Sequence, residues 1–277
     1  LKKLEYRGYD SSGIALHEGK LVFSKKEGPI ANLEKILGTS DSKMAIAHTR
    51  WATHGVPSDV NSHPHLSNDG KIAVVHNGTI DNYLDIKASL ENEGFDFLSE
   101  SDTEVIPNLL SKYYNGDLVK AMSKMLSEIE GIYTIAAIHV DNPEQIVSVR
   151  QETPLVIGLG SGENYVASDI YAILKYTQQI IYPDDHQIVS VSPNEINVYG
   201  EDLSKIDYEV ETVEKYTEVA EKGGFEHFML KEIYEQPKTI FDCLRGRLDA
   251  EKGKVTLGGI NKFKDKLLNA DRILISS

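Results

Sequence analysis

The sequence predicts an α+β protein in which antiparallel hairpins alternate with pairs of helices. Two observations carry this prediction: short apolar runs are joined by tight polar turns, and helical segments come in pairs between them. A doubly wound parallel sheet would instead place a helical crossover between consecutive strands. We therefore expect layers of antiparallel sheet and helix.

Short apolar segments predict the strands. They lie at residues 13–17, 20–25, 44–48, 72–76, 133–139, 145–150, 155–159, 165–168, 187–191 and 196–199. The links HEGK, SGEN and SPNE are short enough to make hairpins of the strands that they join. These pairs of strands are therefore expected to be antiparallel.

Helices are predicted at residues 30–37, 83–93, 103–114 and 118–129. Asp102 stands just before the third of these helices. Its carboxylate there would accept a hydrogen bond from a free backbone N–H and act as the N-cap.

The composition changes near Lys205. Residues 205–224 are charged, have few apolar side chains and end in two glycines, so they predict a linker. Residues 225–248 then predict an amphipathic helix with Pro237 as a site for a kink, and residues 257–268 a loop and a further helix. The opening LKKL resembles the last turn of a helix and the closing ADRILISS a strand. We therefore expect a chain that is truncated at both ends.

The composition excludes several classes of protein. The 277 residues carry a formal net charge of −14, which argues against nucleic acid or an anionic membrane as a partner. No apolar run approaches the ~20 residues that span a bilayer. A single cysteine excludes a disulfide framework and fits a reducing cytosol.

Four polar clusters stand at the ends of apolar segments: AHTRWATHG (47–55), NSHPH (61–65), VVHNG (74–78) and SDTE (101–104). Arg50 supplies a planar cation and Asp102 a carboxylate, and this pair suits the two charged ends of a free amino acid. Asn77 and Gly78 supply an amide donor and a flexible backbone N–H, which suit an oxyanion. Together they predict acyl transfer on an amino-acid side chain.

Each of these residues also has an ordinary structural interpretation. Arg50 suits an ion pair at a strand end, and Asp102 suits a helix cap. Asn77 and Gly78 suit a turn, because Asn-Gly favours positive φ. Trp51, the only tryptophan, either walls a pocket or packs in the core. None of these decides alone, but their co-occurrence at segment ends favours a functional site.

Five histidines lie close together in the sequence: His48, His54, His63, His65 and His76. Their spacings match no ligand pattern, so we expect a hydrogen-bonded polar cluster and no metal. A nucleophile is harder to find. Cys243 lies far from the clusters in a predicted helix, where packing is the better interpretation. The segment GSGEN (160–164) suits a hairpin turn, not the strand-to-helix elbow of a serine nucleophile.

A set of motifs runs through the whole chain in order: LEYRGYDSSG (4–13), AHTRWATHG, SHPH, VVHNG, SDTEV and KEIYEQP (231–237). They resemble the glutamine–fructose-6-phosphate aminotransferases, or glucosamine-6-phosphate synthases. The resemblance implies that residues 1–211 are a glutaminase domain, a four-layer αββα sandwich of the N-terminal-nucleophile type. It further implies a linker at 212–224 and the beginning of an α/β sugar-phosphate isomerase domain at 225–277.

The resemblance implies substrate-binding roles for four residues. Arg50, Thr53 and His54 would bind the α-carboxylate of L-glutamine. Asp102 would bind the α-ammonium group of the same molecule.

The resemblance also implies catalytic roles. Asn77 and Gly78 would form the oxyanion hole, Arg7 would lie beside the nucleophile, and Trp51 would control the passage of ammonia. The family's nucleophile is a terminal cysteine that lies upstream of Leu1, so the chain as given is expected to be inactive by itself.

The implied activity is the formation of glucosamine 6-phosphate from fructose 6-phosphate with ammonia from glutamine, a step of amino-sugar biosynthesis in the cytoplasm. The resemblance implies no cofactor, no metal, and a homo-oligomer assembled through the isomerase half.

Two other interpretations stay open. One is a different glutamine amidotransferase with the same first domain, such as a phosphoribosyl-transferring or asparagine-forming enzyme. The other is a non-catalytic module that binds glutamine or a metal.

Overall fold

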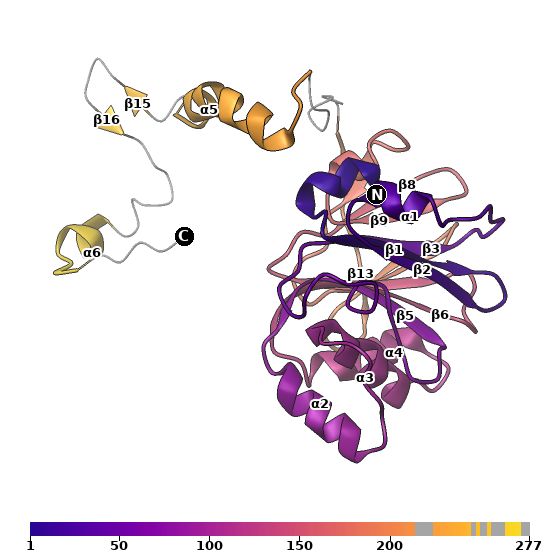
Figure 1. The fold of residues 1–277 in the computed structure, drawn as a ribbon. Coiled ribbons are helices and arrows are strands. Elements are labelled where there is room, and N and C mark those ends of the chain that lie inside the picture. Colours follow the sequence, from indigo (N-terminus) through magenta and orange to yellow (C-terminus); the bar gives the residue numbers. More distant parts are fainter. Residues whose placement is uncertain (214–223, 245–247, 250–253, 256–263, 273–277) are drawn as a thin grey trace. The chain divides into compact units, whose positions relative to one another are not determined.

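The computed structural model describes residues 1–213, 224–244, 248–249, 254–255 and 264–272. The chain divides into two units, Leu1–Ala220 and Glu221–Ser277, and each is described by itself. The first unit holds the layered sheets and helices that the hairpin pattern predicts (Figure 1).

A seven-stranded sheet forms the centre of the first unit, in the order β13-β12-β11-β7-β6-β5-β4. Every neighbouring pair in it is antiparallel. The strands are β4 His65–Leu66, β5 Ile72–Ile80, β6 Gly131–His139, β7 Ile146–Gln151, β11 Ile188–Val191, β12 Ile196–Tyr199 and β13 Lys205–Ile206.

Helices cover one face of this sheet (Figure 1): α2 Tyr83–Asn92, α3 Val105–Tyr113 and α4 Leu118–Leu126. Alternate residues of β5 follow the period of a strand. Ile72 and Val74 pack with Leu109 and Met122 in the core beneath the helices. The residues between them face the opposite way, so odd-numbered positions of β5 point toward the second layer of sheet.

Two smaller sheets form that second layer. One has the order β2-β1-β3 and the other β14-β10-β8-β9. Ala15 and Ile46 of the first pack against Ala73 and Ile138 of the central sheet. The strands are β1 Ser11–His17, β2 Leu21–Glu27, β3 Ala45–Arg50, β8 Val156–Leu159, β9 Asn164–Ala167, β10 Gln179–Ile181 and β14 Glu211–Thr212.

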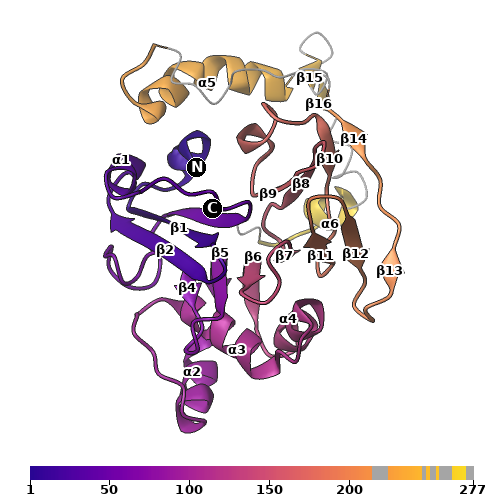
Figure 2. The same cartoon turned by 90° about the vertical axis from the view of Figure 1, so that its right-hand side faces the viewer.

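Short helices lie outside the second layer: η1 Lys2–Arg7, α1 Ile30–Glu34 and η3 Ile170–Ala172. Figure 2 shows α1 beside β1 and β2, on the side away from the central sheet. The order of layers is therefore helix, sheet, sheet, helix, and the α+β prediction is confirmed. The second sheet layer is divided in two, a detail that the sequence did not reveal.

The three hairpins predicted from HEGK, SGEN and SPNE are confirmed as β1–β2, β8–β9 and β11–β12. The predicted linker at 205–224 is wrong in its first part, because β13 pairs with β12 and β14 pairs with β10. Strands of two residues are too short to show a periodic pattern, so no local signal indicates them. Residues 214–223 lie outside the described part.

The second unit contains α5 Phe228–Leu244, the short pair β15 Leu248–Asp249 and β16 Lys254–Val255, and α6 Lys264–Leu268. The amphipathic helix predicted here is confirmed, with Pro237 inside it. The strand predicted within ADRILISS falls on residues 273–277, outside the described residues. No helix in the described part of the chain is long and apolar enough to cross a membrane.

Candidate active site

A cavity of about 730 Å³ lies in the first unit, where the central sheet faces β3 and β9. Seven of the eight site residues predicted from the sequence line it: Arg7, Arg50, Trp51, Thr53, Asn77, Gly78 and Asp102. His54 is the exception, although it stays next to the site. Residues that are far apart in the sequence therefore meet at one place.

Arg50 is the last residue of β3, and only 4% of its surface is exposed. Its Nη2 donates hydrogen bonds to the backbone carbonyls of His54 and Gly55. Nη1 is buried and has no hydrogen-bond partner among the described residues. Burial lowers the pKa of Arg50, and the charges of Asp102 and Asp10 oppose that effect. A buried cation with unused donors suits the binding of an anion.

Asp102 does not cap helix α3, and the sequence prediction was wrong on this point. Ser101 is the N-cap of the short helix η2 (Asp102–Glu104), and its side chain accepts a hydrogen bond from the Thr103 N–H. The Oδ2 of Asp102 instead accepts a hydrogen bond from the backbone N–H of Ile80, at 2.9 Å. This bond fixes a buried carboxylate beside the end of β5.

Asn77 and Gly78 lie inside β5 and not in a turn, because the strand continues to Ile80. They pair with Thr134 and Tyr133 of β6. Asn77 occupies an odd-numbered position, so its side chain faces the cavity. Gly78 has a φ of 113°, and a Cβ added there would lie 2.0 Å from the carbonyl oxygen of Ile132. Only glycine fits this backbone.

Four histidines form a cluster next to these residues: His48, which is partly buried, and His63, His65 and His76, which are buried. The Thr103 hydroxyl joins two of them, at 2.9 Å from His76 Nδ1 and 3.1 Å from His63 Nε2. Burial lowers the pKa of His48 and of His76 to about 4. The cluster is therefore neutral near pH 7. Among the described residues, no group of three or more His, Cys, Asp or Glu side chains is arranged to hold a metal.

The remaining predicted residues stand at the edge of the cavity. Arg7 Nη1 lies 3.6 Å from Asp169 Oδ2, which also accepts a hydrogen bond of 2.6 Å from the Tyr6 hydroxyl. Trp51 is 59% exposed and makes an edge contact with Tyr9. The alternative of Trp51 packing in the core is therefore wrong.

His54 contributes to the site through its backbone rather than its ring. Its carbonyl accepts the hydrogen bond from Arg50, and its ring lies 5.1 Å from that of Tyr83. The resemblance implies that His54 helps Arg50 to bind a carboxylate, and this contact holds the Arg50 side chain in place.

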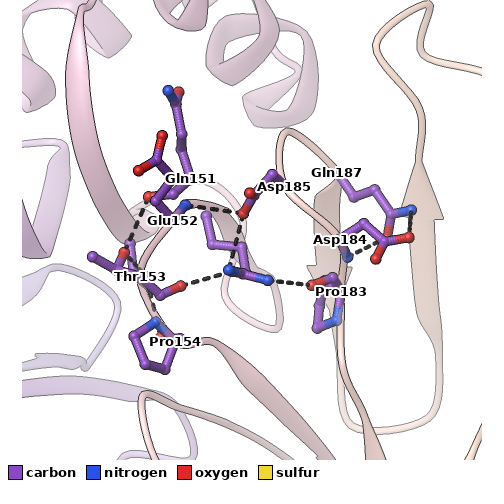
Figure 3. Close-up of polar contacts among 10 residues, drawn as sticks. Gln151, Glu152, Thr153, Pro154, Pro183, Asp184, Asp185 and Gln187 are labelled. Atoms are coloured by element: carbon purple, nitrogen blue, oxygen red, sulfur yellow. Dashed lines mark hydrogen bonds and ion pairs between the residues drawn. The ribbon is translucent and has the colours of Figure 1, made fainter. Parts of the chain in front are cut away.

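The turn after β7 forms a wall of the cavity that the sequence did not reveal. Arg150 fixes this turn: its Nε donates to the Thr153 carbonyl, and its Nη2 pairs with Asp185 at 3.0 Å. Asp185 also accepts a hydrogen bond from the Glu152 N–H (Figure 3). Thr153 and Pro154 line the cavity as a result. These contacts join segments that are distant in sequence, so no local motif indicates them.

The cavity extends past the polar residues between two open strand edges. Among the described strands, β3 pairs only with β1, and β9 pairs only with β8. All of β3 and β9 line the cavity, and so do Leu1 and Leu4 of the first helix. Such edges present unpaired backbone N–H and C=O groups, which an extended segment can satisfy.

Comparison with known proteins finds similarity to glutamine-dependent enzymes. A family model described as a glutamine amidotransferase domain matches residues 48–175, which include seven of the eight predicted site residues, all except Arg7. The glutamine–fructose-6-phosphate aminotransferase of Caldanaerobacter subterraneus is 50% identical over 99% of this chain and 46% of its own length. The chain is thus similar to glutamine–fructose-6-phosphate aminotransferases over nearly its whole length. The Aquifex aeolicus member is 51% identical over 91% of this chain and 43% of its own length.

The chain spans about half the length of the curated family members that it matches. Solved structures resemble it more distantly. Glutamine phosphoribosylpyrophosphate amidotransferase from B. subtilis has a TM-score of 0.61 and 26% identity, over 73% of this chain and 45% of that one. An allosteric regulatory enzyme of purine biosynthesis has a TM-score of 0.63 and 25% identity, over 72% of this chain and 44% of that one. These likenesses confirm the predicted fold class.

Proposed function

We propose that the first unit binds L-glutamine and releases ammonia from its side-chain amide. In a longer protein the ammonia is used to make glucosamine 6-phosphate from fructose 6-phosphate. The observation that carries the proposal is the unpaired Nη1 of buried Arg50, in one cavity with Asp102, Asn77 and Gly78. Arg50 binds the α-carboxylate, and Asp102 binds the α-ammonium group.

The nucleophile is proposed to be a cysteine on an extended segment that pairs between β3 and β9. Its sulfur bonds to the amide carbon, and the carbonyl oxygen becomes an oxyanion held by the Asn77 amide and the Gly78 N–H. The carbon–nitrogen bond then breaks, and the leaving nitrogen takes the thiol proton to give ammonia. Water hydrolyses the thioester to glutamate. Arg7 lies beside this nucleophile, and Trp51 controls the passage of ammonia out of the cavity.

The domain boundaries are part of the same proposal. Residues 1–211 are the glutaminase domain, 212–224 a linker and 225–277 the beginning of an isomerase domain. We propose that the protein is a cytoplasmic homo-oligomer and that it acts without nucleic acid or membrane. The net charge of −14 supports the second point, because both of those partners need a basic surface.

A phosphoribosyl-transferring amidotransferase is the second candidate. It is favoured by the two solved structures, whose likeness covers 72–73% of this chain. The aminotransferases match a larger part, 91–99% of this chain. Residues beyond the glutaminase domain therefore support the aminotransferase.

The test is an assay of the full-length protein that carries this chain and an N-terminal cysteine. We expect glutamate and ammonia from glutamine, and glucosamine 6-phosphate when fructose 6-phosphate is added. A variant with that cysteine changed to alanine is the control, and it should release neither product. A folded full-length protein that does not hydrolyse glutamine would disprove the proposal, and transfer to phosphoribosyl pyrophosphate instead would support the second candidate.

A further inference from the structure

His48 makes a direct contact with the amide that is proposed to hold the oxyanion. It lies on β3, and its Nε2 is 2.9 Å from Asn77 Oδ1 on β5. The two residues are far apart in the sequence and meet across the two sheet layers. Both line the cavity.

The direction of this hydrogen bond follows from its acceptor. A carboxamide oxygen has no hydrogen to donate, so His48 Nε2 carries the proton. The other ring nitrogen, Nδ1, is buried and has no hydrogen-bond partner among the described residues. An unpaired lone pair is tolerated there more readily than an unpaired N–H, which agrees with this tautomer.

The carboxamide is held in one orientation as a consequence. With Oδ1 engaged by His48, the NH₂ group of Asn77 is on the other side of the planar amide. A free Asn amide would exchange its oxygen and nitrogen by rotation about the last side-chain bond. Burial and the charge of Arg50 both lower the pKa of His48, so its ring stays neutral near pH 7.

We propose that His48 is a positioning residue whose Nε2–H fixes Asn77 so that the Asn77 NH₂ group faces the oxyanion. It does not touch the substrate itself. This inference rests on the proposed glutaminase function and names the group that sets the geometry of its oxyanion hole.

Kinetics of the full-length protein test the proposal. His48→Phe keeps the ring and removes the donor, so we expect kcat for glutamine hydrolysis to fall ~100-fold, close to the loss of one oxyanion donor, with KM within ~3-fold. His48→Gln places an amide N–H near the position of Nε2. It should recover at least ~10-fold of the lost kcat.

His65→Phe is the matched control, because His65 is buried in the same cluster but neither contacts Asn77 nor lines the cavity. We expect its kcat to stay within ~3-fold of the wild type. A loss in His65→Phe equal to that in His48→Phe would show a packing role and overturn the proposal. So would a His48→Gln variant as slow as His48→Phe.

A measurement without catalysis separates this inference from the proposed function. ¹⁵N NMR of the chain, with the His48 signal assigned by its loss in His48→Gln, should show a neutral ring with the proton on Nε2. A proton on Nδ1 would overturn the positioning role even if glutamine is hydrolysed. An Nε2–H ring in a full-length protein that fails to hydrolyse glutamine would disprove the function and leave the contact standing.

Discussion

Arg50 and Asp102 show how single residues make this site. Each is buried, and each has its position fixed by backbone groups: the carbonyls of His54 and Gly55 for the cation, and the Ile80 N–H for the carboxylate. A buried charge is costly unless it is paired. Fixing both charges at one cavity prepares them for a ligand that carries the opposite charges.

Arg50→Ala should raise KM for glutamine by roughly 100-fold, because a charge-assisted contact between Nη1 and the α-carboxylate is lost. The sharper measurement uses 4-aminobutanamide, which has the amide but no α-carboxylate. The kcat/KM of the full-length protein for this compound should be nearly unchanged by the substitution. Equal losses for both substrates would mean that Arg50 only supports the loop.

Asp102→Asn provides the complementary prediction. It should lower kcat/KM for glutamine by roughly 10- to 100-fold, since a charge pair with the α-ammonium group is removed. Glutaramate, which lacks the α-amine, should be hydrolysed equally well by wild type and variant. The assignment of Asp102 fails if glutaramate hydrolysis drops as much as glutamine hydrolysis.

Strand β5 is the element that organises the site. Its residues Ile72 and Val74 pack under the helices. Its odd-numbered residues face the second sheet layer, and one of them, Asn77, lines the cavity. Gly78 gives this strand a positive φ close against β6. One strand therefore supplies both the core of the sheet and the proposed oxyanion donors.

Gly78→Ala should lower the free energy of unfolding by roughly 3–5 kcal/mol, because the new Cβ adds both φ strain and overlap with the Ile132 carbonyl. Urea denaturation measures this change. Gly70→Ala is the control: its φ is +69°, but no atom lies within 4 Å of the added Cβ. It should lose only about 1–2 kcal/mol. Equal losses would show that space around Gly78 is not limiting.

The histidine cluster depends on the tertiary structure as a whole, because it forms where strands from different layers and helix η2 meet. Its members keep their neutral form in the folded state and are free to take a proton when the chain unfolds. Burial lowers the pKa of His48 and His76 to about 4 and that of His63 and His65 well below the usual 6.5. Between pH 4 and pH 6.5 the unfolded state therefore binds more protons than the folded state, so acid favours unfolding.

The free energy of unfolding should therefore be highest above pH 6.5 and should fall as the pH drops from there toward 4. His48 and His76 alone give a loss of roughly 4 kcal/mol between pH 7 and pH 5, at up to ~1.4 kcal/mol per pH unit each, and His63 and His65 act in the same direction. Denaturation at both pH values checks this. The His48→Gln variant should have a shallower slope by about one proton. Equal stability at pH 7 and pH 5 would contradict the assignment of neutral buried rings.

Local signals predicted much of the fold. The HEGK turn between two apolar runs gave the β1–β2 hairpin, because a short polar link leaves adjacent strands little choice but to pair. The strand β10 and the pairing of Lys205 with Tyr199 were missed, since segments of two or three residues are too short to show a strand period. Asp102 was misplaced because Ser101 competes for the same cap.

The sequence by itself determined the residue types of the candidate site, the antiparallel hairpins and the resemblance to the aminotransferases, because these depend on side-chain chemistry and on neighbours along the chain. Tertiary structure alone decided that His48 meets Asn77, that Arg50 keeps an unused donor, and that β3 and β9 leave an open gap. Such facts arise where distant strands pack together, and no run of consecutive residues records the distance between them.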